Sequence, residues 1–175
     1  MFQVGVLLLA AGTSRRFGGD KRAAVMPNGK TVLAMTLDNI KQTDLPLKLC
    51  LTDSDRDLAS NLDLDQQQLI FCRNSANGMG ATLADGMAQI EGWQGVIIAL
   101  GDMPWVQPQT YSTLRDSLDT HLTLQTMVAV LRPGVAVSLT QTFINILNTH
   151  TKTNIRLRVY KYMRPELLLE LQRQT

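Results

Sequence analysis

Three short segments of the sequence combine small residues with charged ones in a way that suits the binding of phosphate groups. In the first segment, small residues run from Ala10 to Ser14. Four cations follow within eight positions, namely Arg15, Arg16, Lys21 and Arg22. Small residues let a backbone bring its N–H groups close to phosphate oxygens, and the cations would neutralise a polyphosphate. A glycine-rich surface turn with solvated arginines is the alternative interpretation.

The second segment, Asn77–Gly86, places Gly78 and Gly80 at an apparent helix start. Free backbone amides at such a start can bind a base edge, a ribose or a phosphate, and Thr82 adds a hydroxyl. Ordinary glycine capping of a helix is the alternative for this segment taken alone.

The third segment is Leu100-Gly101-Asp102-Met103-Pro104. Asp102 follows an apolar run and lies between a glycine and a proline, which suits a magnesium ligand beside a phosphate site. The alternative is that Asp102 only caps the turn that follows it.

Two familiar nucleotide-binding fingerprints are absent from these segments. A P-loop that began at Gly12 would need glycine at position 17, where the chain has Phe17. A Gly-x-Gly-x-x-Gly motif that began at Gly78 would need glycine at position 83, where the chain has Leu83. The three segments must therefore be interpreted from the elements that position them.

Strand and helix patterns alternate along the chain. Strands are expected at Phe2–Ala10, Leu45–Leu51, Gln68–Cys72, Gly95–Leu100 and Thr126–Leu131. Helices are expected at Thr31–Lys41, Asp53–Leu62, Met79–Ile90 and Gln107–Leu118, and helical patterns also occur at Val135–Leu147 and Glu166–Leu171. This alternation predicts an α/β fold, a Rossmann-like three-layer sandwich with a mainly parallel central sheet. Ligands of such sheets bind beyond the carboxyl ends of the strands, where all three segments fall.

Composition limits the class of protein. The chain has 175 residues, of which 45% are hydrophobic, so we expect residues 1–175 to form a single domain with a real core. Lys and Arg number 17 against 15 Asp and Glu, and the resulting charge of +2 gives no argument for nucleic-acid binding. The apolar run Val4–Ala11 is too short to span a bilayer and lacks a basic leader, so we expect no membrane partner and a cytoplasmic location.

The stretches LAAGTSRRFGGDK, GMGATLADG and ALGDMPWV, in this order and spacing, resemble the MobA-like nucleotidyltransferase family. The resemblance is strongest to the molybdenum cofactor cytidylyltransferases of that family. Four positions of the family pattern LAAGxSxRxGxxK are in place, namely Ser14, Arg16, Gly18 and Lys21. The resemblance covers residues 3–131, whereas residues 132–175 diverge.

The resemblance implies transfer of a nucleoside monophosphate from an NTP to a phosphorylated acceptor, with release of pyrophosphate and a requirement for Mg2+. In the cytidylyltransferase branch the acceptor is the molybdopterin form of the molybdenum cofactor, and a molybdoenzyme or accessory protein is an expected partner. By matching positions, the catalytic residues are Arg16, Lys21 and Asp102, and Asp102 is also the metal ligand. The nucleotide-binding residues are Leu9, Ala10, Ala11, Gly12, Thr13, Ser14, Lys21, Gly78, Met79 and Thr82, where Thr82 keeps the hydroxyl of the serine usual in the family.

Two questions stay open within the resemblance. Ala10-Ala11-Gly12 resembles the cytidine branch, which favours CTP, whereas Gly18-Gly19-Asp20-Lys21 resembles the guanylyltransferase branch, which makes GTP the alternative. After Pro133 the family normally has a Gly-His-Pro segment and a Gly-Asp stretch that help to form the acceptor site, and this chain has neither. The alternative to an active transferase is therefore a degenerate domain that binds a nucleotide or a protein partner without turnover.

Overall fold

The structure is a computed structural model that describes residues 3–12, 19–93, 95–119 and 127–130. Its strands form one sheet in the order β3-β2-β1-β4-β5, and every neighbouring pair is parallel. The strands are β1 (Val4–Leu9), β2 (Leu47–Leu51), β3 (Leu69–Phe71), β4 (Gly95–Leu100) and β5 (Met127–Val130). The predicted α/β class with a parallel central sheet is confirmed, and β1 lies at the centre of that sheet.

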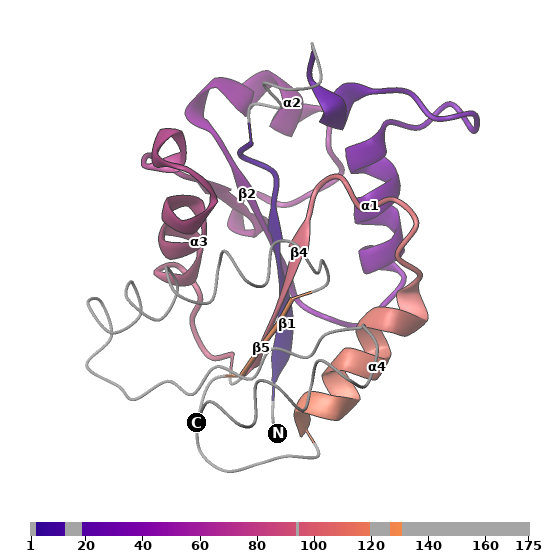
Figure 1. The fold of residues 1–175 in the computed structure, drawn as a ribbon, viewed down its shortest axis with the longest axis vertical. Coiled ribbons are helices and arrows are strands. Elements are labelled where there is room, and N and C mark those ends of the chain that lie inside the picture. Colours follow the sequence, from indigo (N-terminus) through magenta and orange to yellow (C-terminus); the bar gives the residue numbers. More distant parts are fainter. Residues whose placement is uncertain (1–2, 13–18, 94, 120–126, 131–175) are drawn as a thin grey trace, which may run out of the picture.

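Helices cover both faces of the sheet. They are α1 (Val32–Lys41), α2 (Arg56–Ser60), α3 (Met79–Met87) and α4 (Pro108–Asp119). Figure 1 shows α3 on one side of the strands and α1 with α4 on the other. No helix in the described stretches is both long and apolar enough to cross a membrane.

The side chains of β1 show why its sequence is apolar at almost every position. Leu7 and Leu9 pack into the cluster beneath α3, whereas Val6 and Leu8 pack into the cluster beneath α1 and α4. A parallel strand covered on both faces has no solvent side, so it lacks the polar–apolar alternation of a half-exposed strand. The same burial fixes β1 firmly, and its carboxyl end is therefore a rigid starting point for the loop that follows.

The predicted helix Asp53–Leu62 is divided in the structure. Asp53–Asp55 form a 3-10 turn, and α2 covers only Arg56–Ser60. The Asp55 carboxylate accepts the N–H of Thr52, and this local bond favours a tight turn directly after β2. The chain therefore turns sharply at the carboxyl edge of the sheet before α2 begins.

The remaining predicted elements appear with small changes at their ends. The strand expected at Leu45–Leu51 begins at Leu47, because Pro46 has no N–H to contribute to a ladder. Three further 3-10 turns lie at Lys21–Ala23, Gln66–Gln68 and Ser75–Asn77. The helical patterns at Val135–Leu147 and Glu166–Leu171 lie outside the described residues.

Tyr111 on α4 provides a test of the core. Its side chain is fully buried, and burial raises the pKa of its phenol. None of the described residues forms a hydrogen bond with its hydroxyl. Tyr111→Phe removes a polar group that is costly to bury, so we expect the free energy of unfolding to rise by about 1 kcal/mol. Chemical denaturation measures the change, and a loss of stability would show that the hydroxyl has a partner after all.

Candidate active site

A cavity of about 520 Å³ opens at the carboxyl ends of β1, β2 and β4. Nine of the residues predicted from the sequence line it, namely Leu9, Ala10, Ala11, Gly12, Lys21, Gly78, Met79, Thr82 and Asp102. The other three, Thr13, Ser14 and Arg16, lie outside the described residues. The structure therefore brings parts of all three sequence segments to one cavity.

The position of the cavity follows from the strand order. The chain leaves β1 toward β2 and β3, and then crosses back to place β4 on the other side of β1. At such a reversal the connections diverge and leave a crevice at the carboxyl edge of the sheet. The volume is sufficient for a ligand of small-molecule size.

Gly101 sets the distance between the ends of β1 and β4. Its N–H donates to the Leu9 carbonyl at 2.9 Å. A Cβ at this position would lie 2.8 Å from the Cβ of Ala10, closer than packed side chains allow. The glycine thus permits β4 to pair with β1 up to its last residue, and Asp102 follows directly at the cavity wall.

Lys21 and Asp102 contact each other where both line this cavity, although 81 positions separate them in the chain. Lys21 Nζ lies 3.0 Å from Asp102 Oδ2. The Asp102 side chain is 22% exposed, which leaves it accessible from the cavity without full solvation. The site therefore holds one cation and one carboxylate in direct contact beside the loop that follows β1.

The surroundings of Asp102 suit a divalent cation that takes few of its ligands from the protein. The described residues contain no group of three or more His, Cys, Asp or Glu side chains that could surround an ion. Magnesium commonly takes only one or two protein carboxylates and completes its shell with water and substrate phosphates. One half-buried carboxylate facing a roomy cavity fits that mode of binding, and it does not fit a closed structural metal site.

The Gly78 turn closes another wall of the cavity. Gly78 precedes α3 with a φ of +103°, a conformation that side chains other than glycine rarely adopt. Its carbonyl accepts hydrogen bonds from the backbone N–H of Thr82 at 3.2 Å and from the Thr82 hydroxyl at 3.4 Å. Thr82 is buried, so its hydroxyl helps to fix the turn as well as lining the cavity.

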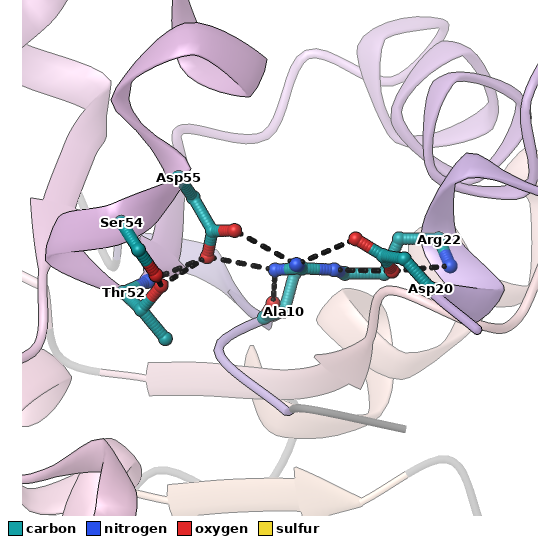
Figure 2. Close-up of polar contacts among 6 residues, drawn as sticks. All are labelled: Ala10, Asp20, Arg22, Thr52, Ser54 and Asp55. Atoms are coloured by element: carbon teal, nitrogen blue, oxygen red, sulfur yellow. Dashed lines mark hydrogen bonds and ion pairs between the residues drawn. The ribbon is translucent and has the colours of Figure 1, made fainter. Parts of the chain in front are cut away.

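Arg22 has partners other than the polyphosphate that we expected it to neutralise. Figure 2 shows its guanidinium group between the carboxylates of Asp55 and Asp20. Both bonds to Asp55 are 2.8 Å long, and Nη2 lies 2.7 Å from Asp20 Oδ2. Nη1 also donates to the carbonyl oxygen of Ala10. Two carboxylates already balance this cation, so the expectation that it pairs with phosphate is not supported.

The ionisation of this cluster follows from its contacts. Hydrogen bonds to Asp20 and Asp55 raise the pKa of Arg22, so it stays charged. The bond from the Arg22 side chain lowers the pKa of Asp20. Burial alone would raise the pKa of Asp55, but hydrogen bonds from Arg22 and Thr52 outweigh it and hold that pKa below 3.8. All three groups are therefore charged at neutral pH.

Several cavity residues were missed from the sequence. Thr52, Ser75 and Ala76 all line the cavity. Thr52 is the first residue after β2, so the rule that singled out the ends of β1 and β4 would also have found it. Ser75 and Ala76 lie in a short 3-10 turn that carries no recognisable sequence signal.

Asp55→Asn tests the charge balance at Arg22. At pH 7 we expect the free energy of unfolding to fall by about 2 kcal/mol, because the largely buried cation loses a charged partner. The pKa of Asp55 is lower in the folded chain than its ordinary value of 3.8, so its stabilising contribution is complete above that value and disappears as the pH falls through the folded pKa. Urea unfolding across this range should show the difference from wild type shrinking in acid. Asp53→Asn, in an exposed ion pair with Arg56, is the control, and an equal effect of both variants would contradict the assignment.

Comparison with curated proteins finds two relatives, both named bifunctional protein GlmU, from two strains of Corynebacterium glutamicum. Each is 28% identical over 138 residues, which cover 74% of this chain. The chain spans only 28% of the length of these relatives.

Comparison with solved structures finds the same fold in mycobacterial proteins. Rv0371c from Mycobacterium tuberculosis H37Rv matches with a TM-score of 0.62 and 24% identity, over 97% of this chain and 98% of that one. Its complex with manganese gives 0.58 and 19% identity over 99% of each chain. A homologue from Mycobacterium sp. strain JC1 gives 0.57 and 18% identity over 98% of each.

The family model described as the MobA-like NTP transferase domain matches residues 6–144. This match includes all three sequence segments and most of the described structure. The chain belongs to the MobA-like NTP transferase family.

Proposed function

We propose that this nucleotidyltransferase-like domain moves a nucleoside monophosphate, preferably CMP, from an NTP to a phosphorylated acceptor of the molybdopterin type. The observation that carries the proposal is the contact between Lys21 and Asp102 inside the cavity at the end of β1. A cation and a potential metal ligand lie there beside the small residues Ala10–Gly12, whose backbone can approach phosphate oxygens closely.

In the proposed reaction an oxygen of the acceptor phosphate attacks the α-phosphorus of the NTP. The new bond joins that oxygen to the α-phosphorus, the bond between the α-phosphorus and the oxygen bridging to the β-phosphorus breaks, and pyrophosphate leaves. Such a transfer needs no protein nucleophile, because the enzyme contributes positioning and charge neutralisation. The backbone of Ala10–Gly12 would hold the triphosphate, and Lys21 would neutralise the leaving pyrophosphate.

Asp102 would hold a divalent cation together with the phosphates. Such an ion supplies charge neutralisation to the triphosphate, and a structural neighbour solved with manganese supports this choice of cofactor. Mg2+ is our proposal for this chain. Lys21 contributes by moving its ammonium group from Asp102 to the phosphates, so that the carboxylate becomes available when the nucleotide is bound.

The choice of substrates rests on the resemblance of the sequence to the cytidylyltransferase branch. Ala10-Ala11-Gly12 favours CTP, with GTP as the alternative, and the molybdopterin acceptor and a molybdoenzyme or accessory-protein partner belong to the same proposal. The relatives named GlmU match this chain over a fraction of their own length, so their names do not identify the acceptor.

The direct test is incubation of the protein with Mg2+, each NTP in turn and a molybdopterin acceptor, while pyrophosphate release is measured. Release with CTP that depends on the acceptor supports the proposal, and release only with GTP would assign the guanylyltransferase branch. Nucleotide binding without pyrophosphate release under any of these conditions would support a domain that binds without turnover.

Lys21→Ala is expected to weaken NTP binding more than tenfold, about 1.4 kcal/mol. The variant removes the ammonium group that contacts Asp102 at the cavity. Arg22, by contrast, is held by Asp20 and Asp55. Isothermal titration calorimetry with the NTP and Mg2+ measures the change. Lys30→Ala, which removes an exposed lysine paired with Asp38, is the control. Unchanged affinity in a folded Lys21→Ala protein would remove this loop from the site.

Asp102→Asn is expected to abolish Mg2+-dependent turnover and leave the fold intact. Asparagine has almost the same shape but lacks the charge that holds a divalent cation. Activity is followed by pyrophosphate release, and circular dichroism checks the fold. Asp38→Asn on α1 is the control, because this carboxylate forms an exposed ion pair with Lys30 and does not line the cavity. Wild-type turnover by Asp102→Asn would show that the metal ligand lies elsewhere.

A further inference from the structure

The hydrogen-bond ladder between β1 and β2 changes at the edge of the cavity. Val6 N–H donates to the Pro46 carbonyl at 2.8 Å, and Ala10 N–H donates to the Cys50 carbonyl at 2.9 Å. In a parallel ladder the next bond runs back from the other strand, here from Thr52 N–H to the Ala10 carbonyl. Instead, Thr52 N–H donates to Asp55 Oδ2 at 2.9 Å, and the Ala10 carbonyl accepts from Arg22 Nη1.

Two side chains therefore occupy the place of one backbone hydrogen bond. Arg22 and Asp55 contact each other through two bonds of 2.8 Å, and Nη1 of Arg22 contacts both the Ala10 carbonyl and Asp55 Oδ2. Figure 2 shows the resulting connection, which runs from Ala10 through the guanidinium and carboxylate groups to Thr52. The pair separates the two backbones where Ala10 and Thr52 line the cavity.

This connection also determines the direction of the next amide. In a trans peptide the carbonyl of one residue and the N–H of the following residue point in opposite directions. The bond from Arg22 to the Ala10 carbonyl therefore fixes the direction of the Ala11 N–H. Arg22 follows Lys21 in the same 3-10 turn, so the pair also anchors the backbone that carries Lys21 toward Asp102.

We infer that Arg22 and Asp55 are positioning residues, which hold the Ala10–Gly12 backbone and Lys21 in the geometry that binds the nucleotide phosphates. This inference rests on the proposed function of the Ala10–Lys21 loop. Neither side chain needs to touch the phosphates, since Arg22 acts through the Ala10 carbonyl and Asp55 acts through Arg22.

A double variant separates this role from a contribution to stability alone. Removing only Arg22 leaves the Asp55 charge largely buried without its main partner, which is destabilising in itself. Arg22→Met combined with Asp55→Leu removes both charges and replaces them with apolar groups, an exchange that proteins often tolerate without loss of stability. A purely structural role predicts that the double variant recovers both stability and nucleotide binding.

The experiment compares wild type, Arg22→Met, the double variant and the control Arg56→Met. Arg56 adjoins Asp55 in the chain but forms an exposed ion pair with Asp53. Thermal unfolding reports stability, and titration calorimetry with Mg2+ and CTP or GTP reports affinity. The 15N–1H resonance of Ala11 without nucleotide reports changes in the hydrogen bonding and surroundings of the Ala10–Ala11 peptide group.

We expect Arg22→Met to lose stability and the double variant to regain part of it, because the buried charge is gone but the Ala10 carbonyl and the Thr52 N–H still lack their side-chain partners. NTP affinity of the double variant should nevertheless stay at least tenfold below wild type, with the Ala11 resonance displaced. Arg56→Met should match wild type in affinity and in the Ala11 resonance. Recovery of both wild-type affinity and the wild-type Ala11 resonance in the double variant would overturn the inference.

Two further outcomes are also decisive. If wild type binds no NTP, the proposed function fails. The positioning role is then tested by the Ala11 resonance alone, and an unchanged resonance in the double variant would overturn it. If the double variant does not fold, Arg22→Lys replaces it, because lysine keeps the charge but cannot bond to Ala10 and bidentately to Asp55 together. Wild-type affinity in Arg22→Lys would overturn the inference, and a severalfold loss with a displaced Ala11 resonance would support it.

Discussion

The parallel register of β1 with its two neighbours determines where the candidate functional residues lie. β1 pairs with β4 from Val4 to Leu9 and with β2 from Val6 to Leu9, so the carboxyl ends of the three strands reach the same edge of the sheet. Every residue that follows one of these ends enters the same small region. The contact between Lys21 and Asp102 is a consequence of this register, because the loop after β1 and the turn after β4 begin beside each other.

Lys21 and Arg22, two adjacent cations of the first loop, make different contacts because their positions and side-chain chemistry differ. Lys21 and Arg22 are neighbours in one 3-10 turn, yet Lys21 contacts Asp102 in the cavity and Arg22 contacts Asp55 next to β2. A guanidinium group can bond to a backbone carbonyl and a carboxylate simultaneously, whereas an ammonium group acts as a compact and mobile charge. The arginine therefore holds several groups in place, and in the proposed function the lysine changes partner when the nucleotide binds.

The sequence was sufficient to predict the fold class and most of the residues at the cavity. Continuous apolar runs such as Gly95–Leu100 identify buried parallel strands, and the rule that ligands bind at the carboxyl ends of strands selects Ala10, Gly78 and Asp102 together. The partnership of Arg22 with Asp55 could not be predicted, because no pattern in the sequence links these two residues, which lie 33 positions apart. Thr52 was missed although it directly follows β2, because the segment after that strand lacks the glycines that mark the other three segments.

The backbone at the end of β1 and β2 explains why a charged pair occupies this place rather than an apolar one. Apolar side chains of similar size would stabilise a fold at least as well as a largely buried ion pair, because burial of two charges is costly. They could not, however, satisfy the Ala10 carbonyl and the Thr52 N–H, which lose their mutual bond where the strands separate. A buried backbone group without a partner costs about as much as a lost hydrogen bond. In this sheet Arg22 provides the donor for the Ala10 carbonyl and Asp55 provides the acceptor for the Thr52 N–H, so the charged pair replaces the bond that these two backbone groups do not form with each other.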